Sequence, residues 1–303
     1  MDLQDFFNSK YGLGIAIAIG RFLPPKIGLL ISDLLATIIA SMGNLTMVKA
    51  IKANQWIVSG KDDLSPRNLK VKAKSVLKHS GRCYYDLYHT FNDPEKILKL
   101  CPNSAAITEI VNLSHDGKGV FVVAPHTSNF DLALRALALH GLNAMLLGTP
   151  TTYSGYEIQN EFRTSTGMEV IPFDEPDIFS RAVKILKNGG VVATGVDRPV
   201  EKRKEKNKVS FFGHPSALPV GYIQIALAAD VPILVMAPKM CSNGTYEIMH
   251  SGLITLKRNA NRFTEIKQNV EMILEIVAGY IKQAPEQWLM FYPVWPDAVE
   301  ELP

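Results

Sequence analysis

The chain has 303 residues, enough for one large α/β domain or for one domain with an additional arm. Hydrophobic residues make up 47% and charged residues 20%, which excludes a disordered chain and supplies a sizeable core. The net charge of +3 is unevenly placed, because residues 1–100 carry 14 Lys and Arg against 8 Asp and Glu, and the remainder carries 18 against 21. A basic N-terminal third suggests a negatively charged partner, and anionic lipid head groups fit as well as nucleic acid does.

Residues 1–100 are expected to be helical throughout, beginning with two interrupted apolar segments. The first covers residues 11–20, and the second covers residues 27–40 but is broken by Asp33. Neither is long enough without a charge to span a bilayer. Asp2 and Asp5 stand where a signal peptide carries basic residues, which argues against a secretory leader. We therefore expect an amphipathic arm lying in the plane of a membrane; the alternative is that these helices cover the domain core.

A change of composition at residues 101–118 separates this arm from a segment in which strands and helices alternate. The expected strands are 119–124, 144–147, 169–173, 191–196, 232–237 and 246–249. The expected helices are 129–141, 154–166, 176–188 and 217–229, followed by a long helix with Phe263, Ile266, Val270, Ile273, Val277 and Ile281 on its apolar face. This alternation predicts an α/β fold with a mostly parallel or mixed central sheet flanked by helices. The expected division is an N-terminal helical membrane-associating arm at 1–100 and an α/β core at 101–303.

A histidine directly follows the first strong strand, where ligands bind in open α/β sheets. His126 is followed by Asp131 in the first turn of the next expected helix, a spacing at which the carboxylate can accept a hydrogen bond from one imidazole nitrogen. The other nitrogen is then a general base toward a hydroxyl. The alternatives are that Asp131 only complements the helix dipole and that His126 is a capping or packing residue.

Two other classes of site are disfavoured by the same sequence. No second His or Cys stands at metal-ligand spacing, and the isolated cysteines at positions 83, 101 and 241 form no CxxC motif. No G-x-S-x-G elbow follows an expected strand, which argues against a serine hydrolase. Isolated cysteines also favour a reducing compartment.

The segment VVAPHTSNFD at residues 122–131 resembles the His-x4-Asp/Glu block of glycerolipid acyltransferases. The likeness is closest to the bacterial lipid A biosynthesis acyltransferases (lauroyl and myristoyl transferases) and the related phosphatidylinositol mannoside acyltransferases. Three further blocks of that family are resembled in order by residues 161–163 with 167–172, by residues 195–199 with 211–213 and 217–221, and by residues 285–291. The sequence departs from the family where Asp197 is followed by Arg198, since many lipid A enzymes have Asp-Gln there, and this leaves the acceptor open.

The resemblance implies an O-acyltransferase that moves a fatty acyl group from acyl-CoA or acyl carrier protein to a hydroxyl of a membrane lipid or glycolipid. No metal or redox cofactor is expected. His126 is the expected base and Asp131 its orienting partner. Arg163 is a candidate for binding an acceptor phosphate or polar head, because a guanidinium fork suits oxyanions; the alternative is an arginine on the helix surface.

Asp197 follows an expected strand at the same sheet edge as His126, where it binds acceptor hydroxyls or assists the base; the alternative is a turn residue. Arg198 is a weaker candidate for the donor phosphates. The basic run 201–208 would dock an acidic carrier protein or coenzyme A, or is simply a solvated loop.

The expected location is the cytoplasmic face of the inner membrane, with peripheral or monotopic attachment to an anionic surface. One alternative is a glycerophosphate or lysophospholipid acyltransferase, and another is a non-catalytic lipid-binding protein on the same fold. Nucleic acid is not expected as a partner, because the basic run lacks a recognisable binding fold.

Overall fold

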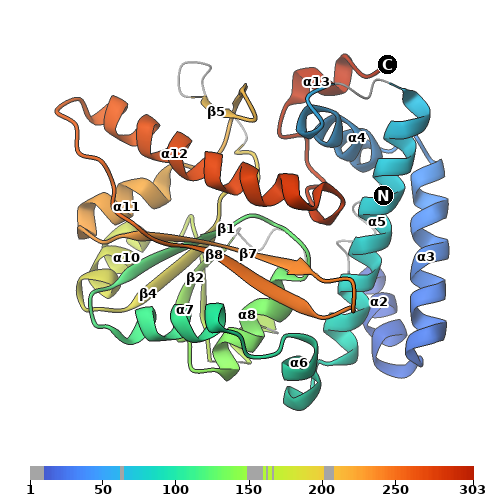
Figure 1. Cartoon of the computed structure of the whole chain (residues 1–303), viewed down its shortest axis with the longest axis horizontal. Coiled ribbons are helices and arrows are strands. Elements are labelled where there is room, and N and C mark those ends of the chain that lie inside the picture. Colours follow the sequence, from blue (N-terminus) through green and yellow to red (C-terminus); the bar gives the residue numbers. More distant parts are fainter. Residues whose placement is uncertain (1–9, 62–64, 149–159, 162, 166, 201–207) are drawn as a thin grey trace.

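Six strands form one mixed sheet at the centre of the computed structural model of this chain (Figure 1). The structure describes residues 10–61, 65–148, 160–161, 163–165, 167–200 and 208–303. Within them the sheet order is β3-β2-β4-β1-β7-β8, parallel except for β8, which pairs antiparallel with β7. The strands are β1 (Val120–Ala124), β2 (Ala144–Gly148), β3 (Glu169–Pro172), β4 (Val191–Gly195), β7 (Ile233–Met240) and β8 (Tyr246–Ile254). The predicted fold class is confirmed.

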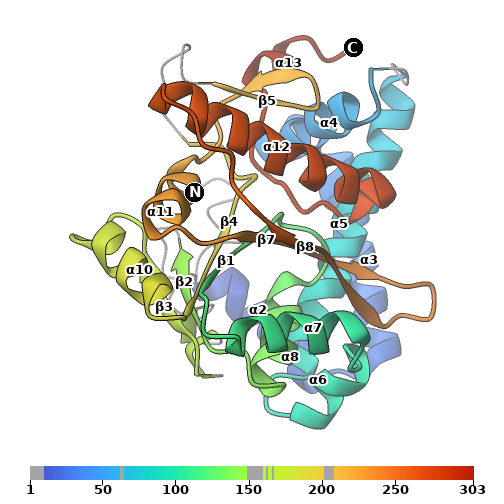
Figure 2. The ribbon, with the colours of Figure 1, turned by 60° about the vertical axis from the view of Figure 1, so that its left-hand side comes forward.

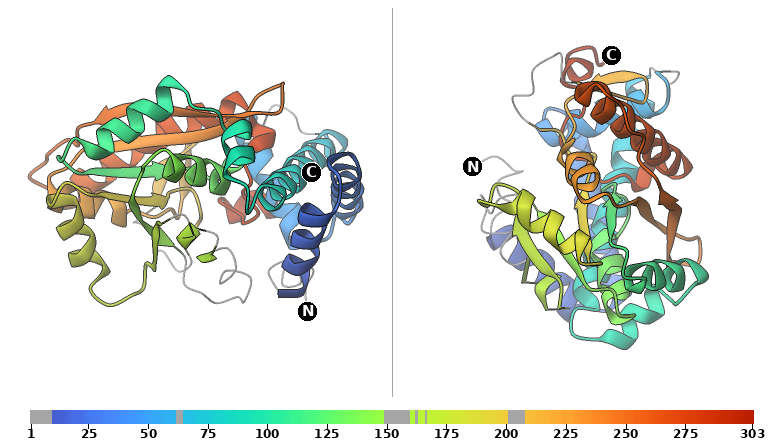
Figure 3. Two further views of the ribbon diagram at one scale, coloured as in Figure 1. Left: turned by 90° about the horizontal axis from the view of Figure 1, so that it is seen from below. Right: turned by 90° about the vertical axis from the view of Figure 1, so that its left-hand side faces the viewer.

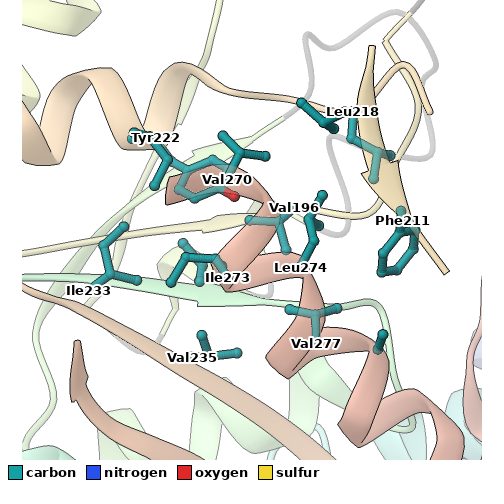
Figure 4. Close-up of a cluster of buried hydrophobic side chains, with 14 of the residues drawn as sticks. Val196, Phe211, Leu218, Tyr222, Ile233, Val235, Val270, Ile273, Leu274 and Val277 are labelled. Atoms are coloured by element: carbon teal, nitrogen blue, oxygen red, sulfur yellow. The ribbon is translucent and has the colours of Figure 1, made fainter. Parts of the chain in front are cut away.

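Helices cover both faces of the sheet, as the apolar, valine-rich inner strands require (Figure 2). One face packs against α10, α11 and α12, and the other against α6, α7 and α8. Their bounds are α6 (Pro94–Leu100), α7 (Ala105–His115), α8 (Phe130–Leu139), α10 (Ile178–Lys187), α11 (Gly221–Ala229) and α12 (Arg262–Gln283). Figure 4 shows the core beneath α12, where Val270, Ile273 and Val277 lie close to Ile233 and Val235 of β7.

The long helix α12 differs from its prediction at one position. Val270, Ile273 and Val277 are fully buried as expected, but Phe263 is 53% exposed. Phe263 is the second residue of α12, and no core cluster includes it. Its assignment to the buried face was therefore wrong.

The N-terminal helices are α2 (Lys10–Phe22), α3 (Pro25–Ser41), α4 (Thr46–Val58) and α5 (Pro66–His89). Figure 3 shows α2 and α3 beside the α/β body, and both pack along α5. The contact at Gly20 is close, because a Cβ there would lie 2.6 Å from Tyr88 Cβ. In contrast, Trp56 and Ile57 of α4 belong to the same core as α11 and α12. The division at residues 100 and 101 stays a prediction.

Large apolar side chains of α2 and α3 remain uncovered. Phe22 is 76% exposed, Leu30 70% and Leu34 59%. Among the described residues, no single helix is both long enough and apolar enough to cross a membrane. Helices α3 and α4 meet those criteria only together, and they are bent by 87° at their junction.

Candidate active site

The site begins with two neighbouring parallel strands that end together. Ala124 at the end of β1 pairs with Gly195 at the end of β4. His126 and Asp197 each follow their strand by two residues, so the chain delivers both to the carboxyl edge of the sheet. The expectation that these two residues share one edge is confirmed.

His126 and Asp197 form a hydrogen-bonded pair. The His126 Nδ1 atom lies 2.5 Å from Asp197 Oδ1, and the His126 amide donates to Asp197 Oδ2 at 2.9 Å. Because an ionised carboxylate only accepts, Nδ1 carries a proton, and in the neutral imidazole Nε2 is then the unprotonated nitrogen. Nε2 has no hydrogen-bond partner among the described residues, and His126 lines a large cavity. The imidazole is thus arranged as a base facing that cavity.

The carboxylate of Asp197 is completely buried, with 0% of its side chain exposed. Its third hydrogen bond comes from Trp288 Nε1, which donates to Oδ2 at 2.7 Å. Burial alone would raise the pKa of Asp197. The facing His126 and the three hydrogen bonds outweigh burial and hold this pKa below its ordinary value. Asp197 therefore stays ionised beneath the imidazole.

Gly195 makes room for the imidazole. A Cβ at this position would lie 2.7 Å from His126 Cε1 and 3.3 Å from His126 Nε2. Any larger residue would push the ring away from Asp197. On its other side the ring meets Phe130 edge-on, with the ring centroids 5.2 Å apart.

The turn after His126 is held by α5. Ser128 has a positive φ of 46°, and its hydroxyl lies 3.1 Å from His79 Nε2. Asn129 accepts a hydrogen bond from the Leu132 amide and so caps α8, while its side-chain amide donates to the Cys83 carbonyl. Burial, and then the nearby charge of Arg82, lower the pKa of His79 to about 4.

Asp131 takes a different place from the one predicted. Its Oδ1 accepts a hydrogen bond from Arg163 Nε at 2.7 Å, and no hydrogen bond joins it to His126 in the described part of the chain. The reason is the strand order. Because β4 neighbours β1, the residue that follows β4, Asp197, lies beside His126 Nδ1. The predicted hydrogen bond from the imidazole to Asp131 is therefore corrected to one with Asp197. Arg163 and Asp131 both line the cavity.

Arg198 also lines the cavity, and its guanidinium lies over the Tyr292 ring at 4.3 Å from the centroid. Asp197 itself does not line the cavity, since it is covered by His126 and Trp288. Of the predicted basic run, only Lys208 is described, and it lines the cavity. The rest of that run and most of the predicted helix 154–166 lie outside the described residues.

The cavity has a volume of about 2420 Å³. This exceeds the roughly 300–1,000 Å³ of a drug-sized site. Its walls include apolar side chains from α2, α3, α10 and α11; examples are Leu13, Ile19, Leu35, Ile178 and Ile225. Within the described residues, no three His, Cys, Asp or Glu side chains cluster in a way that would hold a metal ion.

The fold and the site define an α/β protein whose histidine–aspartate pair is of the kind that activates a hydroxyl beside an apolar cavity. The chain belongs to the bacterial lipid A biosynthesis acyltransferase family, whose sequence model matches residues 103–296. The resemblance inferred from the four sequence blocks is therefore confirmed.

Two curated relatives are phosphatidylinositol mannoside acyltransferases of Mycobacterium tuberculosis, from strains CDC 1551 and H37Rv. Each is 25% identical over 182 residues, covering 59% of this chain and 55% of the relative. The chain thus spans about half the length of the curated relatives it matches. A solved structure, the 1-acyl-sn-glycerophosphate acyltransferase of Thermotoga maritima, aligns over 84% of this chain and 98% of its own, with 14% identity and a TM-score of 0.36.

Proposed function

We propose that this chain is an O-acyltransferase that moves a fatty acyl group from a thioester donor to a hydroxyl of a membrane lipid or glycolipid. The observation that carries the proposal is the His126–Asp197 pair, whose free imidazole nitrogen faces a cavity with apolar walls. An acyl chain buried there gains about 0.8 kcal/mol per methylene. Membership in the lipid A biosynthesis acyltransferase family supports the same reaction.

In the proposed mechanism, His126 Nε2 takes the proton from the acceptor hydroxyl. The acceptor oxygen attacks the thioester carbonyl, the new ester bond forms, and the carbon–sulfur bond breaks. The departing thiolate takes the proton back from Nε2, so the protein ends in its starting state. Asp197 holds the imidazole in the required tautomer and stabilises the imidazolium that forms between the two steps.

Asp131 and Arg163 have a different role in this proposal. Their ion pair lines the cavity, with side-chain exposures of 13% and 18%. Asp131 fixes the guanidinium at the carboxyl edge of the sheet, where Arg163 binds a phosphate or another polar group of the acceptor. Arg198 and Lys208 supply positive charge elsewhere on the cavity wall, suited to the phosphates of coenzyme A or of the carrier-protein prosthetic group.

We further infer that the protein works at the cytoplasmic face of the inner membrane, attached through α2 and α3. The exposed apolar side chains of these helices support this, and so does the basic composition of residues 1–100. Several cavity-lining residues belong to the same two helices, among them Ile15, Leu35 and Ile38. A lipid acceptor whose head group lies at the cytoplasmic surface of the membrane would then be close to the cavity.

Replacing His126 by Ala tests the proposal. Purified protein would be incubated with radiolabelled palmitoyl-CoA and vesicles of a bacterial lipid extract, and labelled lipids would be separated by chromatography. Loss of a general base predicts transfer slower by about two to four decades in a protein that remains folded. The matched control is His115→Ala, because His115 is an exposed histidine of α7 that does not line the cavity. Equal transfer by the His126 variant and the parent would overturn the role of His126 as the base, whereas lipid binding without transfer by the parent would favour a non-catalytic lipid-binding protein.

A further inference from the structure

Trp288 lies behind the proposed catalytic pair and contacts it with its only polar atom. The indole Nε1 donates to Asp197 Oδ2 at 2.7 Å, while the other carboxylate oxygen is used by His126. Resting on the proposed function, we propose that Trp288 is a positioning residue, which fixes the Asp197 carboxylate so that Oδ1 stays aimed at His126 Nδ1. Trp288 does not line the cavity, so its side chain acts on the reaction through Asp197.

The indole itself is fixed by aromatic packing. Trp288 is only 1% exposed, and its ring meets those of Phe211, Phe212 and Trp295 at centroid distances of 6.2, 6.3 and 6.2 Å. Rings packed from several directions leave the indole little freedom to rotate. The donor is therefore held rigidly enough to define the carboxylate orientation.

The backbone of the same segment is attached to the histidine turn. Trp288 bridges Thr127 in antiparallel fashion, the Leu289 amide donates to the His126 carbonyl at 2.8 Å, and the Ser128 amide donates to the Gln287 carbonyl at 2.7 Å. The segment of residues 287–289 thus sets the backbone that carries the imidazole and also holds the carboxylate that orients it. Both members of the pair take their positions from a single element.

The N-terminal end of this segment is anchored as well. The Gln287 side chain accepts from the Met240 amide and donates to the Met240 carbonyl, at 2.7 and 3.0 Å. Gln55 of α4 donates to the Pro285 carbonyl at 2.7 Å. The segment is thereby tied to β7 and to α4. A displacement of Trp288 would need these bonds to break together.

Removing the indole donor has a defined chemical effect. Asp197 would keep the two bonds from His126 but lose the donor that opposes rotation of its carboxylate. With one hydrogen bond fewer, the pKa of Asp197 would rise, and the pair would hold a proton up to a higher pH. The acid limb of the plot of rate against pH would move to higher pH, since the base works only when Nε2 is unprotonated.

The test is Trp288→Phe in the full chain, with release of thiol from palmitoyl-CoA measured against pH. We expect kcat to fall about tenfold to a hundredfold, as for a lost hydrogen bond to a charged group. The KM for palmitoyl-CoA should stay unchanged, and the acid limb should move to higher pH. The control is Trp56→Phe, because Trp56 is a buried tryptophan whose Nε1 has no hydrogen-bond partner among the described residues.

A second measurement keeps the test decisive if the Phe variant does not fold. Incorporation of 3-benzothienylalanine at position 288 keeps the ring shape and removes only the N–H donor. In the parent, the indole N–H resonance of Trp288 should lie downfield of that of Trp56 and should move on Asp197→Asn. Unchanged kcat and acid limb in both position-288 variants would overturn the positioning role. Parental activity in His126→Ala would overturn the proposed function, and the indole resonance would still report the bond itself.

Discussion

At the scale of single residues, the pairing of His126 with Asp197 follows from which strands are neighbours. The sequence placed both residues at strand ends on one edge, but it gave no order for the strands. Asp131 was the nearer carboxylate along the chain and was therefore predicted as the partner. Only the adjacency of β1 and β4 shows that Asp197, 71 positions away from His126, is the carboxylate within hydrogen-bond distance of the imidazole.

Other site residues could have been predicted from the sequence only in part. Arg163 and Arg198 line the cavity at the positions where the family blocks place them, so their location was accessible. Gly195 and Trp288 stand in those same blocks, yet their roles depend on contacts between distant segments. A glycine at the end of a strand is the one local signal that a bulky group approaches the backbone there.

Substitution of Asp197 by Asn distinguishes the two carboxylates. The Asn side chain would turn either its NH2 donor or its neutral oxygen toward His126 Nδ1. In either case the tautomer that carries its proton on Nδ1 would be stabilised less than by a carboxylate. We expect kcat to fall by about two to four decades, with little change in the KM for palmitoyl-CoA. Asp131→Asn, in comparison, should mainly raise the KM for the lipid acceptor. A large fall of kcat in Asp131→Asn together with little change of kcat in Asp197→Asn would assign the orienting role to Asp131.

A pH effect on stability is expected at His79. Its pKa is about 4 in the folded protein, against an ordinary value of 6.5. As the pH falls from about 6.5 to about 4, the unfolded chain binds a proton that the folded protein does not, so the free energy of unfolding decreases by up to about 1.4 kcal/mol per pH unit. His79→Gln removes this proton uptake. Urea unfolding of variant and parent would be measured at several pH values between 7 and 4. The free energy of unfolding should decrease less with falling pH in the variant, and an equal decrease in both proteins would exclude the effect.

At the scale of elements, the strands were predictable because each is a short apolar run with turn residues at its ends. The observed bounds of β1, β2, β3 and β4 lie within one residue of prediction. The hairpin of β5 (Val209–Phe211) and β6 (His214–Ser216) was missed, since strands of three residues carry no measurable periodicity. Helix α11 begins only at Gly221, after Pro219, because a proline disfavours helical backbone at the residue before it.

The attachment of α2 to α5 depends on close approach at a glycine. Gly20→Ala would place its Cβ 2.6 Å from Tyr88 Cβ and 3.2 Å from the Tyr85 carbonyl oxygen. We expect a lower melting temperature, because overpacking at this contact should lower the free energy of unfolding by about 1–3 kcal/mol. Gly14→Ala in the same helix meets no atom within 4 Å and should gain about 0.5–1 kcal/mol from helix propensity. Equal melting temperatures for the two variants would mean that α2 is not packed on α5 in solution.

At the scale of the whole molecule, apolar surface is concentrated on α2 and α3, at one side of the α/β body (Figure 3). The interrupted apolar segments of the sequence predicted these helices, but only the packing on α5 shows which of their side chains stay outside. The uncovered side chains are the basis for the proposed attachment to a membrane.

The triple variant Phe22→Asp, Leu30→Asp and Leu34→Asp tests that attachment. We expect it to lose binding to vesicles of phosphatidylethanolamine and phosphatidylglycerol in a flotation assay, because charged side chains do not enter the lipid interface. High salt should release the parent only partly, since apolar insertion survives screening. Phe263→Asp on α12, which replaces another exposed aromatic residue, is the control and should bind like the parent. Full release of the parent by salt would contradict apolar attachment.

The segment of Gln287, Trp288 and Leu289 links the proposed catalytic arrangement to the order of protein synthesis. Trp288 is made 91 residues after Asp197, and every strand of the central sheet precedes it. A nascent chain can therefore build its sheet while the histidine turn still lacks two backbone partners and Asp197 lacks one donor. Helices α2 and α3 are translated long before that point. Under the proposed membrane attachment and reaction, the growing chain would meet a lipid surface first and would become able to consume thioester only afterwards.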